Sequence, residues 1–251
     1  MRWPMPAVPF TEITDRPDVG RVFTETVRTS IGEADAAERV RLDAIAGRLQ
    51  DVAYFDLVDA GWERPAPWFV RRLRMRVLRF PAFTEVLELA TWCSGIGSAV
   101  AERRTTIRGV EGAHVEAVAQ WVHLDPATAR PLALPERFMG LFAPSANNRR
   151  SRTKLHHAPV PDAAAVATER DFTFRASDVD PAGHVNNAAY WAVLEEELVG
   201  RAASAGFDAE IEHRGPTLPG VVRVLGDGDG RRWVLGSDGE VAASFVVAAL
   251  A

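Results

Sequence analysis

A short stretch in the last third of the chain holds side chains that can do chemistry on a carbonyl group. Residues 178–187 read Asp-Val-Asp-Pro-Ala-Gly-His-Val-Asn-Asn, which places two carboxylates, an imidazole and two amides directly before a helical pattern. Asp180 can activate a water molecule as a general base or attack a carbonyl carbon directly, and the sequence leaves both routes open. Histidine has the ordinary pKa nearest neutral, so His184 can orient or polarise water or substrate, although it could instead be a structural histidine that ties down the loop.

Local backbone preferences predict a turn that leads into the helix. Pro181 disfavours helical geometry at Asp180, and Gly183 permits a sharp turn that would strain other residues. An asparagine at 186 or 187 can cap the following helix, which is what asparagine usually does at a helix start. Free backbone N–H groups and the helix dipole at that end would stabilise a negative charge on a carbonyl oxygen. The candidates for this oxyanion site, or for support of the loop, are Gly183, Val185, Asn186 and Asn187.

The elements that must position this loop occur twice in the same order. Residues 21–28 are rich in β-branched and aromatic side chains and predict a strand, and the apolar spacing of residues 40–60 predicts a helix that ends at Gly61. Four strand-like runs, separated by proline and glycine, follow at 68–80, 86–93, 100–108 and 114–124. The second occurrence of this order predicts a strand at 170–175, a helix at 188–205, and strands near 209–213, 221–225, 233–235 and 241–248.

The repeated order predicts an α+β fold with two similar halves. A strongly curved antiparallel sheet wrapped around one long helix is the hotdog arrangement, and each half would leave an apolar face for the other to cover. We therefore expect a tandem double hotdog, with an N-terminal hotdog domain at 1–135, a linker at 136–168, and a C-terminal hotdog domain at 169–251 that carries the loop. Two unrelated α+β domains are the alternative.

The composition narrows the class of protein. The chain has 251 residues, a formal net charge of -5 and a pI of about 5.7, which argues against nucleic-acid binding because phosphate contacts need a strongly basic face. The single cysteine, Cys93, cannot form an intramolecular disulfide and fits a reducing compartment, so we expect a soluble cytoplasmic protein. No run approaches the ~20 apolar residues that span a bilayer, and we expect no membrane association.

The loop and several first-half motifs together resemble one family. Residues 178–191 resemble the signature of hotdog thioesterases, in which an aspartate precedes Gly-His-Val-Asn-Asn and a tyrosine. The specific likeness is to the acyl-carrier-protein thioesterases of plants and bacteria. That family's N-terminal half is similar in order and spacing to the motifs at 68–72, 80–81, 91–95 and 121–122. The resemblance implies hydrolysis of fatty acyl thioesters, above all acyl-acyl-carrier-protein, to free fatty acid, as in fatty acid biosynthesis and lipid metabolism. It places the catalytic aspartate at Asp180 and the catalytic histidine at His184.

Two positions depart from the family pattern. Ala182 stands where the family usually has an asparagine between the aspartate and the histidine. Gly215, Pro216 and Thr217 stand where a glutamate followed by a cysteine is common. The family's polar network is therefore incomplete in this chain. One of the three consecutive glutamates at 195–197 could substitute as a base, although a solvated helix face is the more ordinary interpretation.

The resemblance also implies an acidic acyl carrier protein, or acyl-CoA, as the substrate carrier. Arg72, Arg74 and Arg76 share one face of a strand by the two-residue alternation and could dock such a partner, as could the basic linker at 149–154. An ordinary solvated surface is the alternative for both. An acyl chain would need an apolar channel, whose natural wall, unless its residues are plain core, is formed by Leu42, Ile45, Leu49 and Val52. The sequence is also compatible with a homodimer.

We expect no cofactor and no metal. His156, His157 and His123 have no partner at metal-ligand spacing, and no nucleotide fingerprint or phosphate-binding Gly-rich loop is present. Cys93 is a poor candidate nucleophile, because a lone cysteine in a strand is usually a small buried hydrophobe. The competing functions are an acyl-CoA thioesterase, a hotdog hydratase or dehydratase, and a catalytically silent acyl-binding protein. The presence of Asp180 and His184 in one loop favours hydrolysis.

Overall fold

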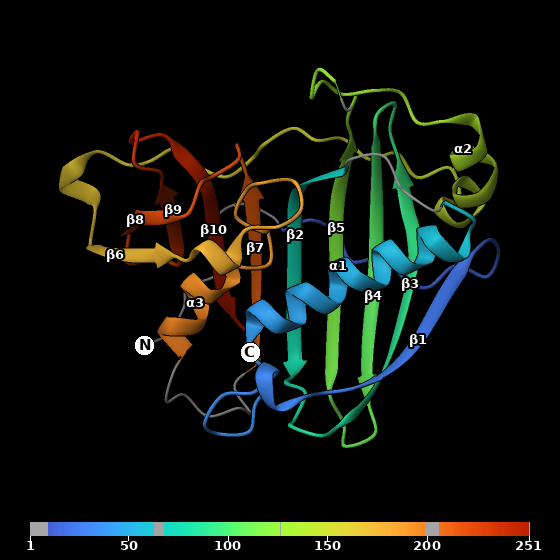
Figure 1. Ribbon diagram of the computed structural model, residues 1–251, viewed down its shortest axis with the longest axis horizontal. Helices are drawn as coiled ribbons and strands as arrows, with labels where there is room; N and C mark the ends of the chain where they lie inside the picture. Colours follow the sequence, from blue (N-terminus) through green and yellow to red (C-terminus); the bar gives the residue numbers. More distant parts are fainter. Residues whose placement is uncertain (1–9, 63–67, 126, 199–205, 251) are drawn as a thin grey trace.

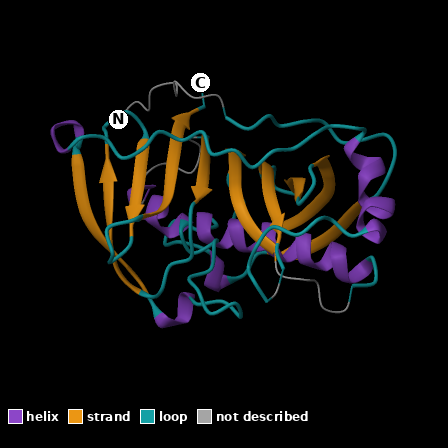
Figure 2. Ribbon diagram, turned by 90° about the horizontal axis from the view of Figure 1, so that it is seen from above, coloured by secondary structure: helices purple, strands orange, loops and turns teal. Residues whose placement is uncertain are grey.

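The structure is a computed structural model that describes residues 10–62, 68–125, 127–198 and 206–250. Its main feature is a 10-stranded antiparallel sheet in the order β1-β3-β4-β5-β2-β7-β10-β9-β8-β6, with helices packed on one face (Figure 1). The strands curve around these helices, as Figure 2 shows from above. The first-half strands are β1 Val22–Arg28, β2 Trp68–Arg79, β3 Val86–Ile96, β4 Val100–Gly109 and β5 His114–His123. The second-half strands are β6 Thr168–Phe174, β7 Phe207–His213, β8 Gly220–Gly226, β9 Arg231–Leu235 and β10 Val241–Ala249.

The two halves join edge to edge into one continuous sheet. Strand β2 pairs with β5 on one side and with β7 on the other, with Arg72 opposite Glu212 and Val77 opposite Phe207. A strand edge presents unpaired N–H and C=O groups, so this pairing satisfies the backbone of both halves at once. The hydrophobic core is also shared, because one cluster of buried side chains runs from Val40 to Val247.

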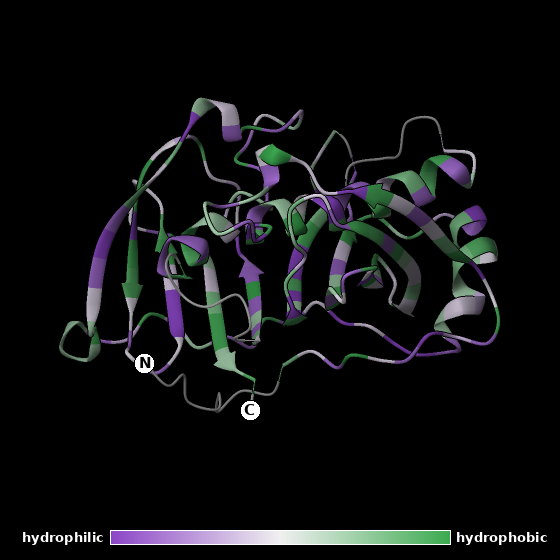
Figure 3. Cartoon of the chain, turned by 90° about the horizontal axis from the view of Figure 1, so that it is seen from below, coloured by the Kyte–Doolittle hydropathy of each residue, from purple (hydrophilic) through white to green (hydrophobic). Residues whose placement is uncertain are grey.

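Alternation along the strands separates an apolar face from a polar one. In β2, Leu73, Met75 and Val77 point into the core, whereas Arg72 and Arg74 lie on the opposite face and pair with acidic side chains of β7. Figure 3 shows the same alternation of hydrophobic and hydrophilic residues along several strands. The side of the sheet away from the long helix therefore carries a layer of ion pairs.

The long helix α1 spans Leu42–Asp59 and lies across the inner face of β2 to β5 (Figure 1). Its apolar stripe is buried and its C-terminal end is closed by Gly61, whose φ of +85° few other residues adopt readily. The helix predicted at 40–60 is thus confirmed, as are the strands predicted in both halves, within a few residues at each end.

The segment expected to be a linker holds more structure than the sequence indicated. Helix α2, Glu136–Phe142, packs Phe138 and Phe142 into a second cluster with Leu57, Cys93 and Ile96 of the first half. A helix of two turns gives too short a periodic signal to separate it from a Pro-rich loop. Beyond α2 the chain runs back across the molecule to the second half, with short 3-10 helices at Ala143–Ala146 and Ala163–Ala165 (Figure 1).

The second-half helix α3 spans Trp191–Leu198. It begins three residues after the predicted start because residues 187–190 form hydrogen-bonded turns. The predicted continuation over 199–205 lies outside the described residues. Short 3-10 helices also occur at Ile31–Glu33 and Ala176–Asp178. None of the described helices is long and apolar enough to cross a membrane.

Candidate active site

The loop between β6 and α3 closes on itself through its own backbone. Val179 and Val185 form an isolated antiparallel bridge, and the Asp180 N–H donates to the His184 carbonyl at 2.9 Å. The Gly183 N–H donates to the Asp180 carbonyl at 2.9 Å, which requires the positive φ of +84° at Gly183. The turn therefore holds Asp180 and His184 side by side on one small hairpin.

Further hydrogen bonds anchor this hairpin to the rest of the second half. The Asn186 N–H donates to the Asp178 carbonyl at 2.8 Å, and the Val185 N–H donates to the Thr217 carbonyl at 2.9 Å. Arg175 forms an ion pair with Asp178 at 2.8 Å on the outer side of the loop. A loop with this much backbone bonding keeps one shape, which a catalytic loop needs.

The two asparagines of the loop lie in the turns that precede α3. The side-chain oxygen of Asn186 accepts the Ala188 N–H at 2.7 Å, which braces the turns at 187–190. Because α3 begins only at Trp191, the prediction that an asparagine at 186 or 187 caps this helix is wrong. The backbone N–H of Asn187 donates to no acceptor among the described residues. This N–H is therefore available to polarise a carbonyl oxygen.

Both candidate catalytic side chains are partly buried at this loop. The Asp180 Oδ1 accepts the backbone N–H of Ala182 at 2.8 Å, so the main chain at position 182 supplies a bond to the carboxylate that its methyl side chain cannot make. The Asp180 Oδ2 has no bonding partner within the described chain, and neither does the His184 ring. Both groups are thus free to contact water or substrate.

Asn187 also reaches a crevice in the first half of the molecule. The crevice lies between α1 and the inner face of the sheet, and its walls are Leu49, Gln50, Val70, Leu73, Arg103, Thr105, Ala117, Ala119 and Trp121. It has room of about 10 Å³, roughly one water molecule, so an acyl chain could enter only if the lining side chains moved aside. Of the predicted channel wall, Leu49 lines the crevice, whereas Leu42, Ile45 and Val52 lie in the core.

A group that sequence reasoning did not single out lies behind the loop. His213, at the end of β7, is buried with its ring 5.0 Å from the ring of Tyr190, and its Nε2 has no hydrogen-bond partner among the described residues. Burial raises the pKa of the neighbouring Tyr190, and the side chain of Thr217 opposes this effect. Burial, with a smaller effect of the charge on Arg71, lowers the pKa of His213 to about 3. Period-two alternation from Ile211 was the available signal, since it places His213 on the inner face.

Comparison with known proteins identifies the family. Two sequence models of one family match this chain, the acyl-ACP thioesterase N-terminal domain over residues 20–142 and the acyl-ACP thioesterase C-terminal domain over residues 162–206. The chain belongs to the acyl-ACP thioesterase family. It is accordingly a thioester hydrolase, and the second match includes the whole of the loop around Asp180.

Relatives in sequence and structure agree with this family. An uncharacterized protein of Mycobacterium tuberculosis is 27% identical over 211 residues, which are 83% of each chain. The palmitoyl-acyl carrier protein thioesterase of Arabidopsis thaliana chloroplasts is 26% identical over 205 residues, 72% of this chain but 48% of the plant protein.

Two solved structures, the 12:0-ACP thioesterase from Umbellularia californica and an acyl-ACP thioesterase from Bacteroides thetaiotaomicron, share the fold. Their TM-scores are 0.70 and 0.69 at 18% and 17% identity, and each covers 91% of this chain and 97% or 98% of its own. The α+β hotdog prediction is confirmed by these similar folds.

The arginine stripe of this acyl-ACP thioesterase is not the exposed cationic face that alternation predicted. Arg72 is buried and pairs with Glu212 at 2.6 Å, and Arg74 pairs with Asp208 at 2.6 Å. Only Arg76 keeps an exposed side chain, at 43%, and it lies 3.7 Å from Asp208. The expectation of a free docking stripe is therefore wrong for Arg72 and Arg74, because β7 brings acids opposite each of them.

The glutamate run on α3 also differs from the predicted solvated face. Glu195 is buried, where it accepts the Leu42 N–H at 2.8 Å and pairs with Arg39. Glu197 forms an ion pair with Arg232 at 3.0 Å, and of the three glutamates only Glu196 is exposed. Glu195 and Glu197 thus connect elements, and neither is free to act as a substitute base.

Cys93 is a buried residue of β3, as the sequence predicted. It is buried in the cluster under α2, and burial raises the pKa of its thiol to about 11. A thiol with so high a pKa is hardly ionised at neutral pH, which makes it a poor nucleophile.

Proposed function

We propose that this acyl-ACP thioesterase hydrolyses fatty acyl chains from an acyl carrier protein and releases free fatty acid. The supporting observation is the position of the 178–187 loop. It presents Asp180 and His184 on a fixed hairpin. A few residues further on, Asn187, whose backbone N–H has no acceptor among the described residues, lines an apolar crevice of the other half that would have to widen for an acyl chain. An acyl thioester needs these three features together, which are an attacking group, an oxyanion donor and a place for the chain.

In the proposed reaction the thioester carbonyl lies between Asp180 and the start of α3. Asp180 acts on the carbonyl carbon through a water molecule or directly, the Asn187 N–H stabilises the negative oxygen, and His184 orients the water or substrate. The new C–O bond replaces the C–S bond, the thiolate of the carrier takes a proton, and water supplies the hydroxyl of the acid. The name of the Arabidopsis thaliana relative, a palmitoyl-acyl carrier protein thioesterase, supports a fatty acyl substrate.

The experiment that tests this proposal compares wild type with D180N on acyl carrier protein and acyl-CoA substrates, with released thiol measured by a chromogenic reagent. Asparagine keeps the side-chain oxygen that accepts the Ala182 N–H, so the loop retains its shape while the carboxylate is lost. We expect kcat to fall by at least about 100-fold, the range over which a positioned acid or base acts.

The matched control is E196Q, at the exposed glutamate of α3, which should keep wild-type kcat. Turnover by D180N within a few-fold of wild type would refute the role of Asp180. Faster turnover of acyl-CoA than of carrier-bound substrate would refute the carrier preference. Wild type that binds acyl chains without turnover would refute hydrolysis itself.

A further inference from the structure

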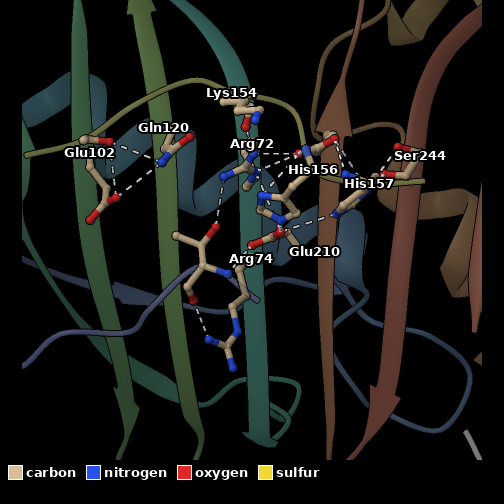
Figure 4. Close-up of polar contacts among 12 residues, drawn as sticks. Arg72, Arg74, Glu102, Gln120, Lys154, His156, His157, Glu210 and Ser244 are labelled. Atoms are coloured by element: carbon tan, nitrogen blue, oxygen red, sulfur yellow. Dashed lines mark hydrogen bonds and ion pairs between the residues drawn. The ribbon is translucent and has the colours of Figure 1, made fainter. Parts of the chain in front are cut away.

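The face of the sheet away from α1 carries a polar cluster that the hydrolysis of thioesters does not use. Along β7, Ala209 and Ile211 point into the core, so Glu210 and Glu212 point to the opposite face. The chain after α2 crosses this face and is held there by Glu212, which accepts the backbone N–H groups of His156 at 2.8 Å and His157 at 3.0 Å. These two bonds hold the backbone of both histidines over β7, and Figure 4 shows their imidazole rings beside Glu210.

Both rings converge on one oxygen of Glu210. The His156 Nε2 is 2.7 Å and the His157 Nε2 is 3.4 Å from the Glu210 Oε1, and the three atoms all lie within 4.8 Å of one another (Figure 4). Two imidazole nitrogens and one carboxylate oxygen at such spacing form a set of ligands for a transition metal.

The bonds of His157 determine which of its nitrogens is free. Its Nδ1 lies 3.1 Å from the carbonyl oxygen of Ser244 and 3.0 Å from the hydroxyl of the same residue. A carbonyl oxygen can only accept, so the Nδ1 carries a proton and donates it. In the neutral ring the Nε2 then holds a lone pair that faces the carboxylate oxygen of Glu210. A positive centre joins such a nitrogen to a carboxylate oxygen, and it is either a proton on Nε2 or a bound metal ion. A carbonyl that accepts from Nδ1 is the usual companion of a metal-binding histidine.

The surroundings of Glu210 leave one oxygen for an ion. Its Oε2 accepts the Thr11 N–H at 2.8 Å. The nearest guanidinium, of Arg72, is 3.7 Å from Oε1 but donates to Glu212 and to the Lys154 carbonyl at 2.6 Å each.

We propose that His156, His157 and Glu210 bind one divalent transition-metal ion such as Zn²⁺, which fastens the 150–158 segment to β7. Ligand atoms about 2.0–2.2 Å from such an ion lie roughly 3–3.5 Å apart, so the 2.7 Å pair needs to open by only a few tenths of an ångström. His156 is 29% exposed, which gives the ion a path from solvent and leaves room for water as a fourth ligand.

The proposal revises the sequence-based expectation of no metal. That expectation considered ligands near His156 and His157 in the sequence, whereas Glu210 is 53 or more residues away and arrives through β7. The site lies on the opposite face of the sheet from the crevice at Asn187, so it does not depend on the proposed hydrolysis of acyl thioesters.

The test is titration of the full-length, tag-free chain with Zn²⁺ after removal of bound metal by a chelator, followed by calorimetry. We expect one equivalent of Zn²⁺ to bind to wild type. H156N should bind at least about tenfold more weakly, because loss of a ligand costs no less than loss of an outer-shell partner. H114N is the matched control, since His114 also contacts a carboxylate, Glu116 at 3.0 Å, but lies outside the proposed ligand set; it should bind like wild type.

Two further measurements separate binding at the proposed ligands from binding elsewhere on the protein. Co²⁺ in place of Zn²⁺ should give wild type a visible absorption band typical of four or five ligands, and H156N should lack it. Zn²⁺ should raise the melting temperature of wild type and H114N but not of H156N. Circular dichroism establishes that H156N is folded. Equal Zn²⁺ binding by all three proteins, or no binding by wild type, would overturn the proposal.

Discussion

Single residues in this acyl-ACP thioesterase take roles that depend on what surrounds them. Ala182 lacks the amide that its family usually has there, yet its backbone N–H still bonds to the Asp180 carboxylate. Thr217 lies in the 215–217 stretch that departs from the family pattern, and its carbonyl accepts the Val185 N–H of the loop. The departures from the family pattern therefore change which atoms hold the loop, while Asp180 stays anchored.

His213 gives a prediction at the residue scale. Because its pKa is about 3 in the folded protein and 6.5 in the unfolded chain, the unfolded state binds one more proton between these values. The contribution of neutral His213 to the free energy of unfolding is therefore fully present above the unfolded pKa. It is lost as the pH falls toward the folded pKa, by about 1.4 kcal/mol per pH unit at most. H213F removes this proton. From about pH 6 to about pH 5, the free energy of unfolding of wild type should fall by roughly 1 kcal/mol more than that of H213F.

Urea unfolding at the two pH values measures this difference. Y190F is the matched control, because it removes the neighbouring hydroxyl but keeps the imidazole, and it should retain the wild-type pH dependence. Parallel curves for wild type and H213F would contradict the buried, neutral state of His213.

At the scale of elements, the carboxylate of Glu195 on α3 connects this helix to the start of α1. The first helix begins at Leu42 without a side-chain cap of its own, and Glu195 of α3 supplies the missing acceptor. The same carboxylate pairs with Arg39, which is buried against the ring of Phe80 at 4.5 Å. Removing one partner of a buried ion pair is costly, because the charge of the other partner stays buried away from water.

The adjacent glutamates test this connection. E195A leaves the α1 N–H unbonded and Arg39 with Asp35 alone, so we expect a loss of about 3 kcal/mol in the free energy of unfolding. E196A, one residue further and exposed, should change it by less than about 0.5 kcal/mol. Chemical denaturation measured by circular dichroism compares the two variants. Similar losses of unfolding free energy in E195A and E196A would mean that the loss comes from α3 itself and not from the contacts of Glu195 with Leu42 and Arg39.

At the scale of the whole molecule, the continuous sheet separates two surfaces. One face carries the helices, the crevice and the loop, and the other carries the ion pairs of β2 with β7. Because these pairs neutralise Arg72 and Arg74, the remaining cations for an acidic carrier lie elsewhere. Arg150, Arg152 and Lys154 have exposed side chains without an ion-pair partner among the described residues. The 149–154 segment is thus the better docking candidate of the two that the sequence offered.

Charge reversal at this segment, R150E/R152E/K154E, should raise the KM for a carrier-bound substrate by about tenfold at low salt. The effect should shrink as salt is added, because screening weakens attraction between exposed charges. The KM for a small neutral thioester should stay unchanged. R223E, at an exposed arginine of β8, is the control and should leave both values alone. An unchanged carrier KM in the triple variant would remove this segment from docking.

The sequence by itself determined what local spacing can encode. Alternation and helical periodicity predicted the element order, and the residues from Asp178 to Asn187 predicted a turn and a capped helix. The positive φ at Gly183 and the buried thiol of Cys93 are observed, whereas the helix begins at Trp191 and not at the predicted asparagine cap. Each depends on neighbours within a few residues or on the hydrophobicity of one strand.

Tertiary structure decided which charges meet, because those contacts join residues far apart in the chain. Alternation placed Arg72 and Arg74 on a common face but could not show that β7 covers it with Glu212 and Asp208. Long-range packing also buries Glu195, leaves the His213 Nε2 without a hydrogen-bond partner among the described residues, and brings His156 to Glu210. A sequence pattern gives the direction of a side chain, whereas only the packed sheet supplies the group opposite it.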